Sequence, residues 1–389
     1  MGKTVLKICS NSWNNASRDK RELSVYRELG ADVAVLAKGE RGDHGRIDNV
    51  DGFRVYRYST RPLGERCPAS VNRFISFFRW ARFARRLNPD IISGHDLIPL
   101  TIGWLSTLGR KEKPKLIYDS HEFELERTDK RGKLEKAFVK NLEGFLMRRC
   151  VFSMMVNDCI ADEVQKIHNL EDKPVVVRNT PNYWKIDQQV CRENKEKFLK
   201  GFEASDLDFI AMFHGNIVSG RGIEYIMKAV ADCPNVGLLV LGNGEEKYLS
   251  TIKALARNCG IESRVQYHPA VPLQDLWKYV GAADVGMIAG PAVIKNFLYS
   301  LPNKFFENIQ SMTPIICPSY PAMQELIEKY QIGLTCDPLD TKAMSSCIQQ
   351  MRNDKEFYAR CKENLKLAKE ELCWEHEKQV LIRAFKEIG

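Results

Sequence analysis

Residues 299–314, YSLPNKFFENIQSMTP, indicate how the second half of the chain is built. The turn Leu301-Pro302-Asn303 predicts a helix start, because Pro is favoured in the first helical turn and Asn is a good capping residue. The amino end of a helix attracts anions through unpaired N–H groups and a partial positive charge. Lys304 adds a full positive charge there, and Glu307, one turn later, offers a carboxylate to hydroxyl groups. An ordinary helix start with a surface Lys and Glu would give the same letters.

The same stretch resembles the signature of retaining glycosyltransferases of family four, which have the GT-B fold. In that family, a loop and the helix after it carry two Glu residues separated by seven positions. Glu307 matches the second Glu, whereas Tyr299 stands at the first position. Some members have a Ser-Leu-Pro-Asn-Lys run like that at 300–304. The resemblance covers nearly the whole chain.

Length and composition predict a soluble protein of two domains. With 389 residues the chain exceeds the ~250–300 residues at which a single core stops growing. The 12 Cys residues are scattered without C-x-x-C pairs, which is typical of thiols in a reducing cytosol. No apolar run approaches the ~20 residues of a membrane span, and the apolar run within the first residues is too short for a signal peptide. We therefore expect a cytoplasmic protein.

The first half of the chain alternates strand and helix patterns, which predicts a parallel sheet in a doubly wound, Rossmann-like α/β domain. The first turn lacks G-x-G-x-x-G, which argues against a dinucleotide site. The predicted strands are 3–9, 31–37, 53–58, 90–96, 115–118, 151–157 and 172–182, and the predicted helices are 18–29, 71–87 and 128–149.

Loops at the carboxyl ends of parallel strands form the binding crevice of such domains. Polar residues in these loops are therefore predicted contacts for an acceptor: Asn11, Trp13, Asn14, Arg18, His95 and Asp96. Turn chemistry in a polar loop, and a capping Asp beside a satisfied His, would explain the same residues structurally.

The run Asp-Ser-His-Glu at 119–122 also follows a predicted strand. In the family, a His placed after a strand and followed by Glu contacts the donor sugar, and the resemblance implies this role for His121. The run HEFEL is not H-E-x-x-H, so a zinc hydrolase is not indicated.

Two basic segments of the first domain admit two interpretations. In the predicted helix 71–87, one stripe holds Phe74, Phe77, Ala81 and Ala84, and another holds Arg79, Arg82 and Arg86. The aromatic stripe could pack on the sheet, or the helix and the basic stretch 128–149 could rest on an anionic membrane surface. The second interpretation predicts a peripheral protein on the inner face of the membrane.

The second domain is predicted to begin with the strand 209–216 and the loop IVSGRG, 217–222. A flexible Gly turn, a cation and a helix amino end suit a diphosphate. Gly215 and Gly222 match the family, whereas Asn216 replaces an Arg and Arg221 replaces a Lys, so that Lys304 would supply the second cation. The resemblance adds further donor contacts at Gly242, Gly244, Val271, Tyr299, Leu301 and Asn303.

The resemblance implies two Rossmann-like domains facing a central cleft. We expect an acceptor domain at 1–183, completed by a returning helix at 373–389, a linker at 184–207, and a nucleotide-sugar domain at 208–372.

The expected activity is transfer of a sugar, with retention, from a nucleotide diphosphate sugar to a hydroxyl of a glycan or lipid-linked acceptor. Arg221 and Lys304 would hold the diphosphate, Glu307 the ribose and His121 the sugar. No cofactor is expected, and UDP is the expected nucleotide. No metal is expected either, because Asp206-Leu207-Asp208 precedes a strand and so lies at the edge of the sheet away from ligands.

Two other classes of function remain open on the sequence. Tyr299 and Asn216 depart from the family pattern, which would fit a catalytically inactive partner subunit. The net charge of +8 would fit a basic nucleic-acid binder, but the chain has no recognised nucleic-acid module, and no nucleic-acid partner is expected.

Overall fold

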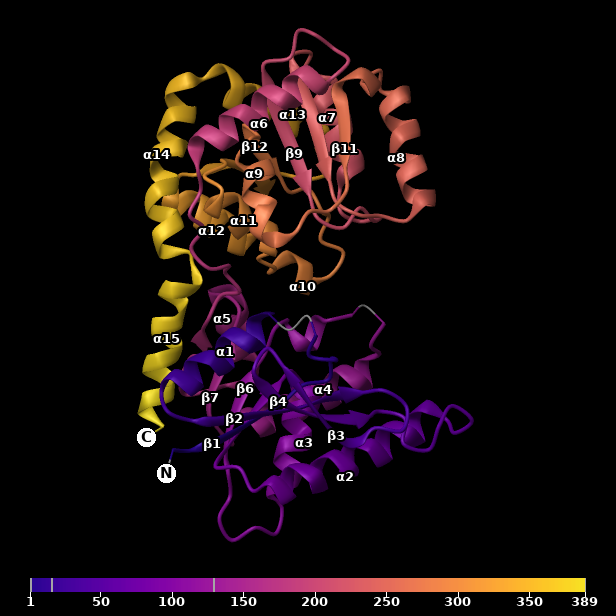
Figure 1. Ribbon diagram of the computed structural model, residues 1–389, viewed down its shortest axis with the longest axis vertical. Coiled ribbons are helices and arrows are strands. Elements are labelled where there is room, and N and C mark those ends of the chain that lie inside the picture. Colours follow the sequence, from indigo (N-terminus) through magenta and orange to yellow (C-terminus); the bar gives the residue numbers. More distant parts are fainter. Residues whose placement is uncertain (1, 15–16, 129, 389) are drawn as a thin grey trace. The chain divides into compact units, whose positions relative to one another are not determined.

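The computed structural model describes residues 2–14, 17–128 and 130–388. Parts of the predicted loop 10–17 and of the predicted helix 128–149 therefore lie outside the described residues. The chain forms two compact units. One unit contains the chain up to Asn179 together with the segment from Glu377 onward, and the other is Thr180–His376 (Figure 1).

The first unit is built on a twisted sheet with the strand order β3-β4-β2-β1-β5-β6-β7-β8. Pairing is parallel except between β3 and β4, which confirms the predicted doubly wound sheet. The strands are β1 (Thr4–Ile8), β2 (Asp32–Gly39), β3 (His44–Val50), β4 (Phe53–Ser59), β5 (Ile91–His95), β6 (Lys115–Asp119), β7 (Cys150–Met155) and β8 (Val175–Val176).

The helices of the first unit differ from the sequence prediction at three places. The segment 128–149 contributes one helix only from Lys133, and neither the buried apolar helix α3 nor the helix α5 was predicted. The described helices are α1 (Ser17–Glu28), α2 (Ala69–Leu87), α3 (Leu97–Thr107), the 3-10 turn η1 (Glu124–Glu126), α4 (Lys133–Met147) and α5 (Asp158–His168).

The buried face of α2 includes only part of the predicted stripe. Ala81 and Ala84 of that stripe face the core together with Trp80, whereas Phe74 is 63% exposed. Asn72 fixes this orientation, because its side chain accepts the Leu63 N–H at 2.9 Å and donates to the Gly64 carbonyl at 2.8 Å. Of the two interpretations, packing on the sheet therefore fails for Phe74 but agrees with the burial of Ala81 and Ala84.

The second unit has a wholly parallel sheet with the strand order β11-β10-β9-β12-β13-β14. Alternate residues of β9 enter different apolar clusters: Phe213 contributes to the cluster with α7, α8 and α13, and Met212 to the cluster with α6 and α9. Helices thus cover both faces. The strands are β9 (Phe209–His214), β10 (Val236–Leu241), β11 (Val265–His268), β12 (Val285–Met287), β13 (Ile315–Pro318) and β14 (Gly333–Cys336).

The helices of the second unit carry the remaining apolar side chains, with α11, α12 and α14 sharing one cluster. Two short 3-10 turns, η2 (Glu262–Arg264) and η3 (Leu273–Asp275), complete the unit. The helices are α6 (Gln188–Gly201), α7 (Ile223–Ala231), α8 (Glu246–Asn258), α9 (Leu276–Val280), α10 (Lys295–Leu298), α11 (Asn303–Gln310), α12 (Pro321–Tyr330), α13 (Thr341–Asn353) and α14 (Lys355–Glu371).

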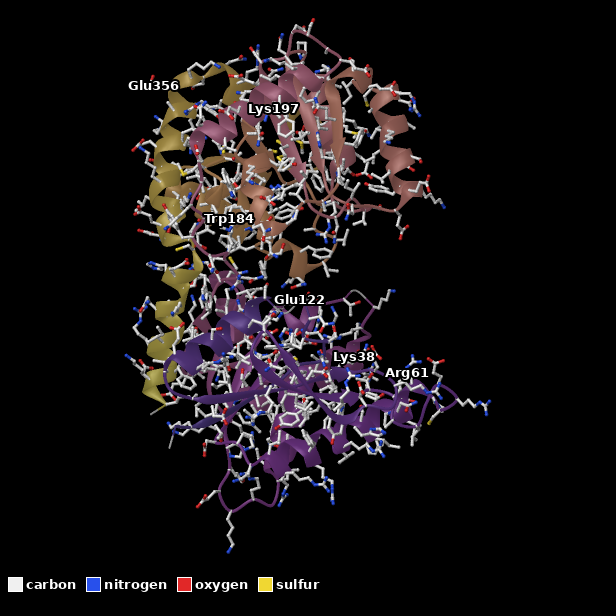
Figure 2. All side chains as sticks on the ribbon, in the orientation of Figure 1. Lys38, Arg61, Glu122, Trp184, Lys197 and Glu356 are labelled. Carbon is white, nitrogen blue, oxygen red and sulfur yellow. The ribbon has the colours of Figure 1, made fainter. Side chains whose placement is uncertain are left out.

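The predicted linker 184–207 is an integral part of the second unit. Phe198 of α6 and Phe202 just after it lie in the core beside α9. The Trp184 backbone N–H donates to Gln310 Oε1 at 3.1 Å, and Figure 2 labels Trp184 together with Lys197 of α6. The linker prediction rested on the charged residues of this segment, which lie on the outer side of an amphipathic helix.

The last helix, α15 (Trp374–Glu387), returns to the first unit from Glu377 onward. Phe385 stacks on Tyr26 of α1 with ring centroids 4.3 Å apart. The buried carboxylate of Glu377 accepts two hydrogen bonds from Arg178, one from its backbone N–H at 2.9 Å and one from its guanidinium at 3.1 Å. Among the described residues, no helix combines the length and apolar character needed to cross a membrane.

Candidate active site

Loops at one edge of the second sheet bring the predicted donor residues together. All six strands are parallel, so their carboxyl ends share that edge with the amino end of α11. Two glycines allow the close approach. Gly222 has φ 79°, and a Cβ there would lie 1.9 Å from the Ala289 carbonyl oxygen. Gly242 has φ 153°, and its Cβ would lie 1.8 Å from the Gly215 carbonyl oxygen.

Lys304 is a half-buried cation in the first turn of α11. Its Nζ lies 3.8 Å from the centroid of the Phe213 ring, and a Cβ on Gly215 would lie 3.6 Å from the same nitrogen. Burial lowers the pKa of Lys304 to about 7, the neighbouring charge of Arg221 lowers it too, and Glu307 partly opposes both. The edge therefore has a deficit of negative charge that a bound anion would correct.

Glu307 is held by a residue that the sequence analysis missed. His214 ends β9, is buried, and its Nε2 lies 2.9 Å from Glu307 Oε2. The hydrogen bond to Oε2 orients the carboxylate. Among the described residues no hydrogen bond reaches Oε1, which is left for a ligand hydroxyl. The signal was the position of His214 at the strand end, directly before the loop glycine.

The other predicted donor residues lie around the same edge. Arg221 is exposed and lines a pocket of about 380 Å³ together with Lys304. Leu301 packs against the apolar cluster of α11, and Tyr299 caps the carboxyl end of α10. The remaining residues lie in loops, with Asn216 exposed after β9, Gly244 bridged to Ile217, Val271 packed against the α6 cluster, and Asn303 exposed at the start of α11.

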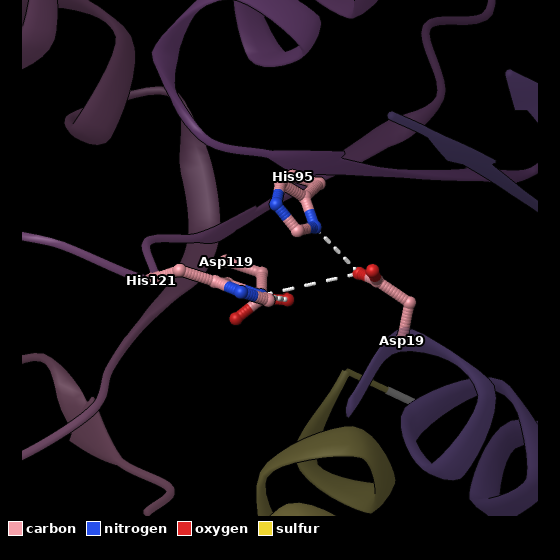
Figure 3. Close-up of side chains that lie close together, drawn as sticks. All are labelled: Asp19, His95, Asp119 and His121. Atoms are coloured by element: carbon pink, nitrogen blue, oxygen red, sulfur yellow. Dashed lines mark hydrogen bonds and ion pairs between the residues drawn. The ribbon is translucent and has the colours of Figure 1, made fainter. Parts of the chain in front are cut away.

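The first unit holds a second group of polar side chains, shown in Figure 3. Asp19 comes from α1, His95 from β5, and Asp119 and His121 from the end of β6 and the loop after it. His95 Nδ1 lies 2.7 Å from Asp19 Oδ1, and His121 Nε2 lies 2.9 Å from Asp119 Oδ2. The two imidazole rings are in contact, with centroids 3.8 Å apart.

A fully buried lysine neutralises this group. Lys7 Nζ lies 2.8 Å from Asp119, 3.2 Å from Asp19 and 2.5 Å from Glu22. Burial would raise the pKa of Asp119, but Lys7, His121 and Arg18 hold that pKa well below its ordinary range. Burial would lower the pKa of Lys7, and the surrounding carboxylates raise it instead. The ammonium thus stays charged among carboxylates.

The same surroundings shift the pKa values of the two imidazoles in opposite directions. Burial lowers the pKa of His121, although Asp119 opposes this. Burial alone would lower the pKa of His95 as well. The hydrogen bond to Asp19 and the negative charge of Asp19 outweigh burial and raise the pKa of His95. His95 is therefore protonated before His121 as the pH falls, and His121 remains a neutral hydrogen-bonding group.

These four side chains could be considered as metal ligands, because their donor atoms lie within 4.8 Å of one another. The ammonium of Lys7 already contacts both carboxylates, and each imidazole nitrogen nearest them shares a hydrogen bond with one. A divalent ion would place a second cation beside a buried one, which is unfavourable. The donor set therefore does not fit a resident metal.

Two predicted acceptor residues have side chains that face inward. Trp13 is fully buried with φ 63° and packs edge-on against Phe53, with centroids 5.8 Å apart. Arg18 donates to the Val177 carbonyl at 2.7 Å and to Asp119 Oδ1 at 3.0 Å. Both side chains support the loop from within, so neither presents a surface to an acceptor.

The polar residues of the first loop do line a pocket. Asn11 and Asn14 border a space of about 310 Å³ with Lys38 and Arg57, beside the carboxyl ends of β1 and β2. Arg57 also donates to Asn14 Oδ1 at 3.2 Å. Figure 2 labels Lys38 in this unit.

Asp96 lies away from that pocket, at φ 68°, where it accepts the His121 N–H at 3.1 Å and ion-pairs with Arg127 at 3.1 Å. It therefore fixes the backbone of the loop that carries His121.

Comparisons with known proteins agree with this architecture. The model of the Glycosyl transferase 4-like domain matches residues 23–180, and that of Glycosyl transferases group 1 matches residues 194–368. An uncharacterized glycosyltransferase of Methanocaldococcus jannaschii is 22% identical over 373 residues, which cover 90% of each chain. The lipopolysaccharide core biosynthesis glycosyltransferase LpsE of Rhizobium meliloti is 27% identical over 154 residues, 40% of this chain and 42% of LpsE.

Among solved structures, Anabaena HepE in complex with UDP-glucose superposes with a TM-score of 0.71 at 14% identity, covering 99% of this chain and 100% of HepE. Two Rossmann-like units of this kind define the GT-B architecture. The chain is a member of the group 1 glycosyltransferases.

The buried Lys7 network makes a prediction about stability. Replacing Lys7 with Met leaves buried carboxylates without their cation, so the unfolding free energy of the first unit should fall by about 3–5 kcal/mol. Urea unfolding of the full chain, followed by circular dichroism, measures this loss. Lys173→Met, which removes a surface ion pair of the same unit, should cost at most about 1 kcal/mol. Equal small losses in both variants would contradict the account.

Proposed function

We propose that this glycosyltransferase moves a sugar from a uridine diphosphate sugar to a hydroxyl of a glycan or lipid-linked acceptor, with retention of anomeric configuration. The observation that carries the proposal is the meeting of Arg221, Lys304 and Glu307 at the carboxyl edge of the second sheet. The complex of HepE with UDP-glucose supports the choice of nucleotide, and the matching family supports the reaction.

Each donor residue has a separate task in this proposal. Arg221 and Lys304 neutralise the diphosphate, on which negative charge accumulates as the sugar leaves. Glu307, oriented by His214, accepts hydrogen bonds from the ribose hydroxyls. His121 keeps the role that the family resemblance implies, contact with the transferred sugar, and its neutral state suits a hydrogen bond to a hydroxyl.

Retention requires the acceptor to attack the face from which the diphosphate departs, unless a covalent intermediate forms. None of the proposed site residues is a carboxylate placed to attack the sugar, because Glu307 is engaged with His214 and assigned to the ribose. The departing phosphate oxygen would then take the proton of the acceptor hydroxyl. The fixed cations at the edge favour this by stabilising the leaving group.

The first prediction from this proposal concerns Arg221. Replacing it with Ala removes a charge-assisted hydrogen bond and should weaken UDP binding by roughly 1.5–3 kcal/mol. Isothermal calorimetry with UDP measures the change. Arg257→Ala removes an exposed guanidinium of the same unit and should leave the affinity unchanged. Unchanged affinity in the Arg221 variant would overturn its assignment.

Lys304 adds a pH signature to the same measurement. Its pKa of about 7 must rise when a diphosphate binds, because the anion favours the charged amine. The complex should therefore take up a proton at pH 8, and affinity should fall as the pH rises above 7. Calorimetry in buffers of different ionisation enthalpy detects the uptake. Lys304→Arg, which stays charged, should abolish it.

Metal independence is a second prediction. The Asp206-Leu207-Asp208 run lies before β9. Arg352 donates to both carboxylate oxygens of Asp208, from Nε at 2.6 Å and from Nη2 at 2.7 Å. This carboxylate is therefore committed to an ion pair at the far edge of the sheet. Transfer should persist in EDTA, measured by release of UDP. Complete loss of turnover that magnesium or manganese restores would refute this expectation.

A membrane surface near the acceptor is supported by apolar side chains on two helices. Phe74 and Phe78 of α2 are exposed and pack edge-to-face with ring centroids 4.9 Å apart, and Leu134 and Phe138 of α4 are 89% and 66% exposed. Neither pair extends beyond the middle of its helix, and α3 packs between α2 and α4. Helices that connect parallel strands begin at the carboxyl edge, so both pairs lie toward the acceptor loops.

Basic residues accompany these pairs, with Arg79 and Arg82 on α2 and Lys133 and Lys140 on α4, all exposed. Each such cation near an anionic surface contributes about 1 kcal/mol. LpsE is named for lipopolysaccharide core biosynthesis, which supports a lipid-linked acceptor here.

Vesicle flotation is the third test. The full chain should co-migrate with anionic vesicles at low salt and detach as salt rises. The double variant Phe74→Ser, Phe78→Ser should float less, whereas Ile47→Ser, which changes an exposed apolar residue on β3, should float normally. Absence of flotation at low salt would favour a soluble acceptor.

A further inference from the structure

The pocket that adjoins the donor cations is unusually apolar for a sugar site. Besides Arg221 and Lys304, its lining includes Ile288, Val293, Phe297 and Met323. All residues that line this pocket lie within the described part of the chain, and none of them carries a carboxylate or a carboxamide. An unmodified hexose presents several hydroxyls that require hydrogen-bond partners, and the side chains of this pocket offer few of them.

Three hydroxyl groups line the pocket, those of Ser219, Ser300 and Tyr320, and the last two are already engaged. Tyr320 Oη accepts the Ala292 N–H at 2.6 Å and donates to the Gly290 carbonyl at 3.2 Å. Ser300 Oγ donates to the Phe297 carbonyl at 2.8 Å. These bonds hold the loop between β12 and α11, which forms one wall. They leave the wall apolar toward the interior of the pocket.

Two apolar side chains stand open at this wall. Val293 is 73% exposed and Phe297 is 44% exposed, whereas Ile288 and Met323 behind them are buried. The opposite wall is the loop 218–221, and the two walls approach closely, because a Cβ on Gly290 would lie 3.3 Å from the Gly220 carbonyl oxygen. The volume of about 380 Å³ is at the lower end for a ligand site and suits part of a nucleotide sugar.

The positions of Arg221 and Lys304 indicate which part of the donor would fill the pocket. A diphosphate held by Arg221 and Lys304 places the group attached to its outer phosphate beside these apolar side chains. Resting on the proposed function, we propose that the transferred sugar carries a methyl-bearing substituent, either an acetamido group or a 6-deoxy carbon, which packs against Val293 and Phe297. Both substituents end in a methyl group: the acetamido group replaces a hydroxyl of the common hexose, and the 6-deoxy carbon is a methyl in place of the hydroxymethyl group.

Calorimetry of the full chain with four uridine compounds tests this: UDP, UDP-glucose, UDP-N-acetylglucosamine and UDP-6-deoxyglucose. At least one methyl-bearing donor should bind about fourfold more tightly than UDP-glucose, the effect of burying one methyl group. The donor that shows the preference distinguishes the acetamido from the 6-deoxy source. If UDP-glucose binds as tightly as both methyl-bearing donors, the inference is overturned. The proposed function still stands in that case, because UDP itself binds. No binding of any of the four would overturn both.

Two single variants test whether Val293 and Phe297 cause the preference for a methyl-bearing donor. Val293→Ser and Phe297→Ser change exposed side chains, so they should fold normally, keep the affinity for UDP, and lose most of the discrimination between donors. Leu339→Ser, a change at an exposed apolar residue outside the pocket, should keep it. Undiminished discrimination in both pocket variants would contradict the assignment of these side chains.

Discussion

Parallel pairing is the constraint on which the second unit depends. Because all six strands run the same way, every strand ends, and every connecting helix begins, at one edge of the sheet. That edge gathers helix dipoles, loop amides and the side chains of residues far apart in sequence. His214 and Glu307 meet there although 93 positions separate them. Glycines at 222 and 242 then allow the loops to approach where any other residue would collide.

Charge is arranged in opposite ways in the two units. In the first, buried Lys7 is matched by the carboxylates of Asp19, Glu22 and Asp119, so the cluster is satisfied from within. In the second, burial without a matching anion lowers the pKa of Lys304 to about 7. A satisfied network holds a loop in place, whereas an unsatisfied cation favours an incoming anion. The physical contrast explains why the diphosphate is assigned to the second unit.

Most of the strand and helix pattern could be predicted from the sequence, because periodicity is a local property. The donor loops were assigned through the family resemblance, and their role stays a prediction. The Lys7 network could not be predicted, since Lys7 and Asp119 are 112 positions apart and their contact depends on strand order. A charged residue in the apolar strand 3–9 was the available signal. The exposure of Phe74 could not be predicted, because Asn72 anchors α2 through hydrogen bonds that no apolar periodicity reveals.

Hydrogen–deuterium exchange of the full chain with and without UDP tests the central claim most directly, since it locates the nucleotide without assuming any residue's role. The account predicts slowed exchange in 215–222, 242–244 and 299–307, the loops and helix start at the carboxyl edge of the second sheet. Protection confined to the opposite edge of that sheet, or no protection at saturating UDP, would contradict it.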